Sequence, residues 1–166
     1  MKFDPNIVQT RYDSPLGPML LAATDHGLAG VWFDDQRHLP EGTHDWPAQP
    51  DHPVLQEAIA QLDDYFAGRR QDFELPLDLR GGTAFQQAVW RALLAIPRGQ
   101  TLSYGALAQR IGKPAAVRAV GAAVGRNPAS VVVPCHRVLG QSGALTGYAG
   151  GLARKTALLR LEGALA

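Results

Sequence analysis

The stretch that decides the fold is TLSYGALAQRIGKPAAVRAVGAAVGRNPASVVVPCHRV, residues 101–138. Its first part predicts a short helix that Ser103 or Thr101 caps and that Gly112 ends. Pro114 then stands at about the first position of a second helix, where proline is favoured because it has no N–H to satisfy. Two short helices joined by a tight glycine-containing turn predict a helix-turn-helix, which is weak evidence for DNA binding by itself.

The second predicted helix covers residues 115–126 and has two different faces. Successive helical residues are rotated by about 100°. Three valines therefore share a stripe that we expect to face the core, and these are Val117, Val120 and Val124. The neighbouring face carries small residues, namely Gly121, Ala122 and Gly125. Arg118 is the one long cation on that face, which suits entry into a groove, although a surface arginine beside small packing residues remains the alternative.

Downstream of this helix, three valines lead into Pro134-Cys135-His136-Arg137, which contains the only cysteine of the chain. A single thiol excludes an internal disulfide and a cysteine-rich zinc site. Neighbouring His and Arg side chains lower the pKa of a thiol and favour the reactive thiolate, whereas a small buried structural cysteine is the alternative. Adjacent side chains of an extended chain point to opposite sides, so we expect a water molecule to link Cys135 and His136.

The final predicted helix runs through Leu152, Leu158, Leu159 and Leu161 and offers a partner for this histidine. Glu162 lies four residues after Leu158 and three after Leu159, so it continues an apolar stripe. A glutamate there is either partly buried with a partner, in which case it could orient His136, or exposed at a fraying helix end.

The residues before the helix-turn-helix predict a small sheet followed by helices. Alternating apolar residues and intervening turns indicate a three-stranded antiparallel meander over residues 7–12, 18–23 and 28–33. Residues 34–52 are polar and are predicted to form a loop. Helical spacing then follows in two stretches, Leu55-Ile59-Leu62-Phe66 and Phe85-Val89-Leu93-Ile96, with an extended segment at 73–79 between them.

Gly81-Gly82 is the predicted hinge between an N-terminal domain (1–80) and a C-terminal domain (81–166). The fold class is therefore α+β, with a small antiparallel sheet and helix followed by a mostly helical domain. Charge is also divided unevenly along the chain, with the change of sign after residue 100. Residues 1–100 carry 8 basic and 14 acidic side chains, a net charge of −6, whereas residues 101–166 carry 8 basic and one acidic, a net charge of +7. The second part is thus expected to face a polyanion and the first part to face water.

The remaining composition narrows the class of protein. No apolar run reaches the roughly 18 residues of a membrane span, and the first residues lack the apolar stretch of a signal peptide, so a cytoplasmic protein is expected. Four of the five histidines, His26, His38, His44 and His52, are scattered through polar sequence and are interpreted as solvated side chains without a metal.

The motif Pro134-Cys135-His136-Arg137-Val138 resembles the active-site motif of the O6-alkylguanine-DNA alkyltransferases, the methylated-DNA–protein-cysteine methyltransferases. Other stretches match this family in order and approximate spacing over nearly all of residues 83–163: Thr101–Gly105, Arg118–Gly121, Asn127-Pro128, Gly147–Gly151 and Leu161–Gly163. The first 80 residues match only in their strand-rich character. The resemblance implies a ribonuclease H-like N-terminal domain.

The resemblance also implies roles for individual residues. Cys135 would accept the alkyl group, His136 would act as base through water, and Glu162 would orient that histidine. The Tyr104 hydroxyl would act at guanine N3 and help the base leave as a neutral species. Arg118 would fill the base stack after the nucleotide is flipped out. Asn127 would tie the helix-turn-helix to the active-site segment. The substrate pocket would involve the Cys135 and Val138 carbonyls, Tyr148 and Ala149. The helix facing the minor groove would present Arg118, Ala119, Gly121, Ala122 and Arg126.

The implied activity is direct DNA repair by irreversible, single-turnover transfer of a methyl or other alkyl group from O6 of guanine, and from O4 of thymine, to Cys135. The implied partner is double-stranded DNA containing the lesion, bound by a monomer without cofactor or structural zinc. Ala149 departs from relatives that carry a hydroxyl residue there. Three alternatives remain: an alkyltransferase-like lesion sensor, a helix-turn-helix regulator, and a cysteine hydrolase using Cys135 and His136, for which adjacent residues are poor geometry.

Overall fold

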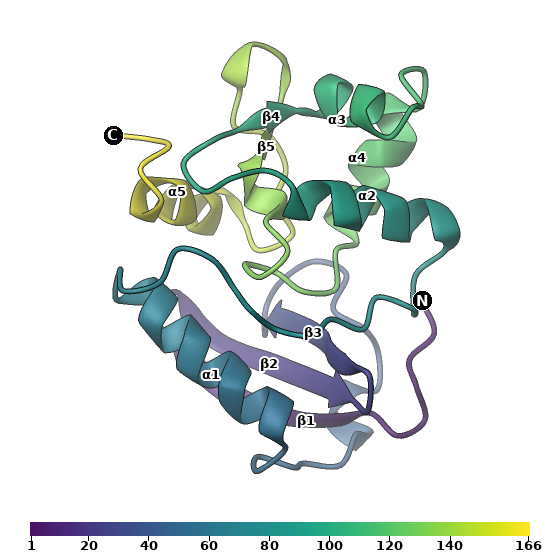
Figure 1. The fold of residues 1–166 in the computed structure, drawn as a ribbon, viewed down its shortest axis with the longest axis vertical. Coiled ribbons are helices and arrows are strands. Elements are labelled where there is room, and N and C mark those ends of the chain that lie inside the picture. Colours follow the sequence, from purple (N-terminus) through teal and green to yellow (C-terminus); the bar gives the residue numbers. More distant parts are fainter.

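The computed structural model describes all 166 residues, and Figure 1 shows two layers stacked on one another. The lower layer begins with an antiparallel meander, β1 (Val8–Ser14), β2 (Gly17–Thr24) and β3 (Gly27–Phe33), in the order β1-β2-β3. Helix α1 (Pro53–Phe66) packs on one face of this sheet, as Figure 1 shows. The predicted strands and helix are confirmed. His52 caps α1 by accepting a hydrogen bond from the Val54 N–H at 3.2 Å.

Both faces of β2 are buried, which explains why its central residues are almost continuously apolar. One face contributes Met19, Leu21 and Ala23 to the main core. The opposite face contributes Leu20 and Ala22 to a smaller cluster, against which Phe3, Leu39 and Trp46 pack. Residues 34–52, predicted to be a loop, contain only one short 3-10 helix (Thr43–Asp45) and supply Leu39 and Trp46 to this cover.

The open edge of β3 is covered by two segments far apart in the sequence. Near its start, the Leu28 N–H donates to the Pro76 carbonyl at 2.8 Å, so the predicted irregular strand around Pro76 pairs at an edge. Near its end, the Val31 N–H donates to the Pro128 carbonyl at 2.8 Å, and the Ser130 N–H returns a bond of 2.9 Å. The segment that precedes Cys135 is therefore anchored on the N-terminal sheet.

The upper layer holds the remaining helices (Figure 1). They are α2 (Ala84–Leu94), α3 (Tyr104–Arg110), α4 (Val117–Gly125) and α5 (Leu152–Leu161). Thr83 and Gln86 form a capping box on α2, and Ser103 caps α3. A two-stranded parallel sheet, β4 (Leu102–Ser103) with β5 (Val138–Leu139), joins the start of the helix-turn-helix to the segment after Cys135.

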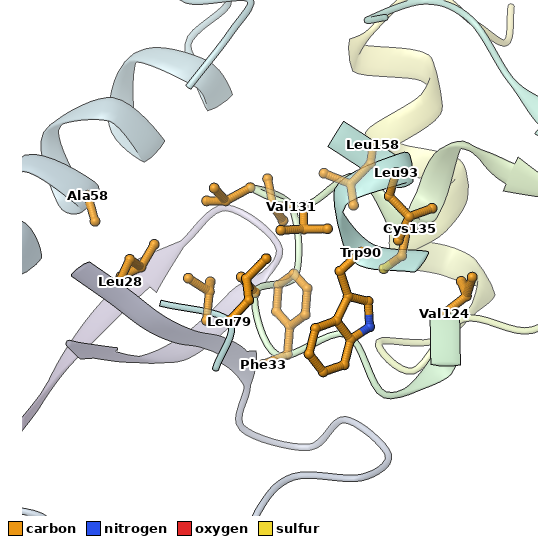
Figure 2. Packing of buried hydrophobic residues seen from close by; sticks show 14 of the residues in the cluster. Leu28, Phe33, Ala58, Leu79, Trp90, Leu93, Val124, Val131, Cys135 and Leu158 are labelled. Carbon is orange, nitrogen blue, oxygen red and sulfur yellow. The ribbon is translucent and has the colours of Figure 1, made fainter. Parts of the chain in front are cut away.

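One continuous hydrophobic core links the two layers. Figure 2 shows Leu28 and Ala58 from the lower layer and Trp90, Leu93 and Leu158 from the upper layer within the same cluster. Trp90 also donates its indole N–H to the Ala123 carbonyl at 2.8 Å, which fixes α2 against α4. The division at Gly81-Gly82 stays a prediction, since the two parts share this core.

Two local predictions are wrong. Helix α4 begins at Val117 with Ala116 as its cap, so Pro114 lies in the turn and does not open the helix. Val117 was predicted to face the core with Val120 and Val124, but it is the first residue of α4 and is 38% exposed, whereas the other two are buried. The turn is tight because Gly112 adopts a left-handed backbone (φ 74°), which ends α3 and redirects the chain.

Candidate functional site

Cys135 lies on a single turn of 3-10 helix (Cys135–Arg137) that directly precedes β5. This corrects the prediction of an extended chain, although the structure gives no hydrogen bond between Cys135 and the His136 ring. Cys135 is 6% exposed, and Figure 2 shows it near Leu93 in the core. Burial raises the pKa of the Cys135 thiol, because the thiolate is poorly solvated there.

A pocket beside α4 reaches Cys135. Its walls are formed by Tyr104 from α3, three residues of α4, the loop after β5 and two residues of the N-terminal part. The lining residues are Arg37, His38, Tyr104, Gly121, Val124, Gly125, Cys135, Gly147, Tyr148 and Ala149. The structure thus brings Tyr104, Gly121, Tyr148 and Ala149 together around Cys135, whereas Val138 is buried behind the pocket wall and is absent from its lining.

Two tyrosines give this pocket hydroxyl groups. Burial raises the pKa of both Tyr104 and Tyr148, so each hydroxyl retains its proton and can donate a hydrogen bond. The Tyr148 hydroxyl is buried, and Ser130 and Cys135 are its polar neighbours.

Behind Cys135 lies a buried charged network around Glu162, which is 6% exposed. One carboxylate oxygen, Oε2, interacts with His136 Nε2 at 2.8 Å and accepts from Arg137 Nη2 at 2.9 Å. The other oxygen accepts from Arg137 Nε at 2.8 Å, so the arginine binds the carboxylate in a bidentate manner. Of the two readings of Glu162 left open by the sequence, the buried and partnered one is therefore observed.

This arrangement sets the charge states. Burial opposes ionisation of Glu162, but hydrogen bonds from His136 and Arg137 outweigh it and hold the pKa of Glu162 well below its usual range. Burial lowers the pKa of His136, which leaves a neutral imidazole. The His136 Nδ1 atom is buried and makes no hydrogen bond within the chain. Since Glu162 occupies Nε2, Nδ1 is the nitrogen left free to take a proton.

Tyr65 joins this network from helix α1 and was missed by the sequence reasoning. Its hydroxyl donates to Glu162 Oε2 at 2.7 Å, and the side chain is fully buried. Burial and the neighbouring Glu162 charge raise the pKa of Tyr65, so the hydroxyl stays a donor. The guanidinium of Arg98 lies 5.5 Å from the centre of the Tyr65 ring and donates to the Leu161 carbonyl at 2.9 Å. No sequence signal separated Tyr65 from the apolar stripe of α1, because its partner is 97 residues away.

Lys155 on α5 is a second missed residue, with a fully buried side chain. Its ammonium group donates to the carbonyls of Val138 at 2.6 Å, Thr146 at 2.9 Å and Gly147 at 3.2 Å. Burial lowers the pKa of Lys155 to about 8. Lys155 thereby fastens the pocket loop to the segment that carries Cys135. A lysine inside an otherwise apolar helical stripe is the only signal that could have found it.

Asn127 connects α4 to the Cys135 segment. Its amide Nδ2 donates to the Val133 carbonyl at 2.8 Å, and its Oδ1 accepts from the Ala129 N–H at 3.0 Å. The residue is 4% exposed, so both bonds are made in a buried environment. The position of α4 and the position of the cysteine are therefore coupled by one side chain.

The face of α4 that was predicted to contact DNA is exposed on the surface of the molecule. Arg118, Ala119, Ala122 and Arg126 are exposed, and neither arginine makes a hydrogen bond or ion pair within the chain. Gly121 turns toward the pocket, where a Cβ atom would meet the Tyr104 ring at 3.9 Å. This face and the mouth of the pocket are thus continuous across α4.

No group of three or more histidine, cysteine, aspartate or glutamate side chains is placed to hold a metal ion. No helix of the structure is long and apolar enough to cross a membrane. The site itself holds a buried thiol, a neutral imidazole that a carboxylate positions, and two protonated phenols.

Comparison with known proteins gives consistent matches. Residues 84–164 match the family described as 6-O-methylguanine DNA methyltransferase, DNA binding domain, and residues 7–79 match its ribonuclease-like domain. A methylated-DNA–protein-cysteine methyltransferase of Mycobacterium tuberculosis is 53% identical over 150 residues, covering 90% of this chain and 88% of its own. That of Methanosarcina acetivorans is 47% identical over 152 residues, covering 92% and 96%.

Solved structures agree with these relatives. The crystal structure of Mycobacterium tuberculosis OGT in complex with DNA has a TM-score of 0.85 at 48% identity, covering 94% of this chain and 92% of that one. The O6-methylguanine-DNA methyltransferase of Pyrococcus kodakaraensis has a TM-score of 0.65 at 26% identity, covering 95% and 99%.

Proposed function

The chain belongs to the O6-methylguanine DNA methyltransferase family, and from this premise we propose that it repairs DNA by moving an alkyl group from O6 of guanine to Cys135. It is a methylated-DNA–protein-cysteine methyltransferase and binds DNA. One observation supports the assignment of residues: Cys135 lines the pocket, and the neighbouring His136 is held by Glu162 with its Nδ1 atom free.

The proposed reaction begins with the thiol protonated, as its burial dictates. A water molecule passes the Sγ proton to His136 Nδ1, and Glu162 stabilises the imidazolium that forms. The thiolate attacks the alkyl carbon, the carbon–O6 bond breaks and a thioether forms. Tyr104 donates its phenolic proton to guanine N3, and the imidazolium proton then restores the phenol. The net change moves the thiol proton to guanine and the alkyl group to sulfur, so each molecule acts once.

The base must leave the DNA duplex to reach this buried thiol, which costs a few kcal/mol. The exposed face of α4 beside the pocket mouth supports insertion of Arg118 into the gap left by the base. The small residues Ala119 and Ala122 allow the helix to lie close to the minor groove, where readout is nearly independent of sequence. We propose lesion-containing double-stranded DNA as the substrate, O4-alkylthymine as a second one, and a monomer as the acting species.

The test is intact mass after incubation of the protein with duplex DNA that contains O6-methylguanine. We expect one added methyl group, located at Cys135 by peptide mapping. The Cys135→Ser variant should gain no mass while it still binds the duplex. Unchanged wild-type mass with tight binding to the lesion would instead support a sensor, and continuous turnover of an ester would support a hydrolase.

A further inference from the structure

The arginines of the chain fall into two groups by the partners of their guanidinium. Nine donate a hydrogen bond within the chain, for example Arg11 to Asp34, Arg69 to Asp64 and Arg154 to Asp35. Four have no such bond: Arg37, Arg110, Arg118 and Arg126. Three of the four belong to the helix-turn-helix. Arg37 is the exception, because it comes from the acidic N-terminal part.

Arg37 is held at the pocket by its backbone. Its N–H donates to the Ala149 carbonyl at 2.8 Å, which ties it to the loop that lines the pocket. The preceding Gln36 is buried, and its Oε1 accepts from the Phe33 N–H at 2.8 Å and from Ser130 Oγ at 3.2 Å. The backbone is thus fixed to both parts of the molecule, while the Arg37 side chain remains exposed.

Basic side chains line this pocket and the groove that adjoins it, where Glu41 is the one acidic side chain. His38 follows in a left-handed conformation (φ 61°) and lines the same pocket as Arg37, and it also lines an adjoining groove with Arg126. Partial burial lowers the pKa of His38, and the charges of Arg126 and Arg37 lower it further. An anion bound near both guanidinium groups would relieve the repulsion between their charges.

We propose that Arg37 binds a DNA phosphate next to the flipped nucleotide, so that the N-terminal part completes the DNA interface. This rests on the proposed function. A guanine that reaches Cys135 fills the pocket, and its sugar and flanking phosphates must remain at the mouth. Arg37 lines that pocket with its side chain exposed, and guanidinium geometry matches a phosphate. The contact would hold the extruded strand from the N-terminal part of the protein.

The experiment compares wild type with Arg37→Gln in the full chain, on duplex DNA containing O6-methylguanine and on free O6-benzylguanine. We expect Arg37→Gln to slow duplex repair about two- to fivefold and to reduce the slope of log K against log salt by about one. Reaction with free O6-benzylguanine should be unchanged. Arg69→Gln is the matched control, because it removes one charge from an exposed arginine already paired with Asp64.

A second arm locates the phosphate. Replacing either phosphate flanking the lesion by a neutral methylphosphonate should slow wild type at one of the two positions and leave Arg37→Gln unaffected there. The proposal is overturned if wild type and Arg37→Gln have the same salt slope, or if the substitution slows the reaction with free O6-benzylguanine as much as duplex repair. It is also overturned if each methylphosphonate slows Arg37→Gln as much as it slows wild type. Failure of the proposed function would show differently, as a wild type that gains no methyl group.

Discussion

The charged residues around Glu162 and those on the outer face of α4 occupy opposite environments. In the first region, His136, Arg137 and Glu162 are almost completely buried, and the carboxylate interacts with three side chains. In the second, Arg118 and Arg126 are exposed and have no partner in the chain. The Glu162 carboxylate has its partners within the protein, whereas Arg118 and Arg126 have none there.

The difference shows how one small protein combines binding and chemistry. A buried ion pair gains from fixed geometry, and its loss leaves an uncompensated charge, so the catalytic network also contributes to folding. An exposed arginine contributes little to stability and is free to meet a ligand. Mutations should therefore reduce both stability and activity in the first region, but only activity on DNA in the second.

The largest effect is expected for Glu162→Gln. The neutral amide leaves the buried Arg137 charge uncompensated, which should lower the free energy of unfolding by about 3–5 kcal/mol and slow methyl transfer about a hundredfold. Because folding lowers the Glu162 pKa, its contribution is complete above the unfolded value of about 4.3 and is lost as the pH falls further.

Urea unfolding of both proteins from pH 7 down to pH 3 measures this contribution. The difference in free energy of unfolding between wild type and Glu162→Gln should be largest at neutral pH and should decrease in acid. Glu74→Gln, at an exposed residue, is the control and should unfold like wild type. A difference in free energy of unfolding that does not change with pH would show that the Glu162 charge does not stabilise the network.

Arg118→Ala should have the next largest effect. Without the side chain that fills the stack, repair in duplex DNA should slow about thirtyfold, since unstacking costs a few kcal/mol. The rate with free O6-benzylguanine and the unfolding free energy should both stay at wild-type values. Arg110→Ala is the control, because it removes an equally unpaired charge from α3. A smaller loss of duplex repair rate in Arg110→Ala would distinguish insertion of Arg118 into the stack from general electrostatic attraction to DNA. Equal slowing on duplex and free base would remove the flipping role.

Tyr65→Phe should have the smallest effect and tests whether α1 tunes the catalytic network. The hydroxyl withdraws charge from Glu162 Oε2, so its loss should raise the His136 pKa and move the acid limb of the rate profile upward by about half a pH unit. In wild type that limb should lie below 6.5, since burial lowers the His136 pKa. The unfolding free energy should fall by about 1.5 kcal/mol.

Tyr12→Phe is the matched control, because Tyr12 makes a bond of the same length, 2.7 Å, to Asp63 away from the pocket. It should lose comparable stability and keep the wild-type pH profile. Identical profiles for all three proteins would reduce Tyr65 to a structural role.

Prediction from sequence was accurate where the signal is local. Alternating and helical patterns located β1, β2, β3, α1, α2 and α5 to within a few residues. It failed at Pro114, where a proline compatible with a helix start lies in the turn before one. It also left the pKa of the thiol undetermined. The adjacent His136 and Arg137 suggested a lowered pKa, but both side chains turn to Glu162 and burial raises the pKa of Cys135.

The sequence by itself determined the order of elements, the single thiol and the small-residue face around Arg118, because these depend on spacing along one chain. Only the tertiary structure decided which side chains meet. Tyr65 reaches Glu162 across 97 residues, and Arg37 reaches the pocket loop through Ala149. Such contacts arise when α1 and the sheet pack against α5 and the pocket loop, and no periodicity along the chain encodes a partner that burial selects in three dimensions.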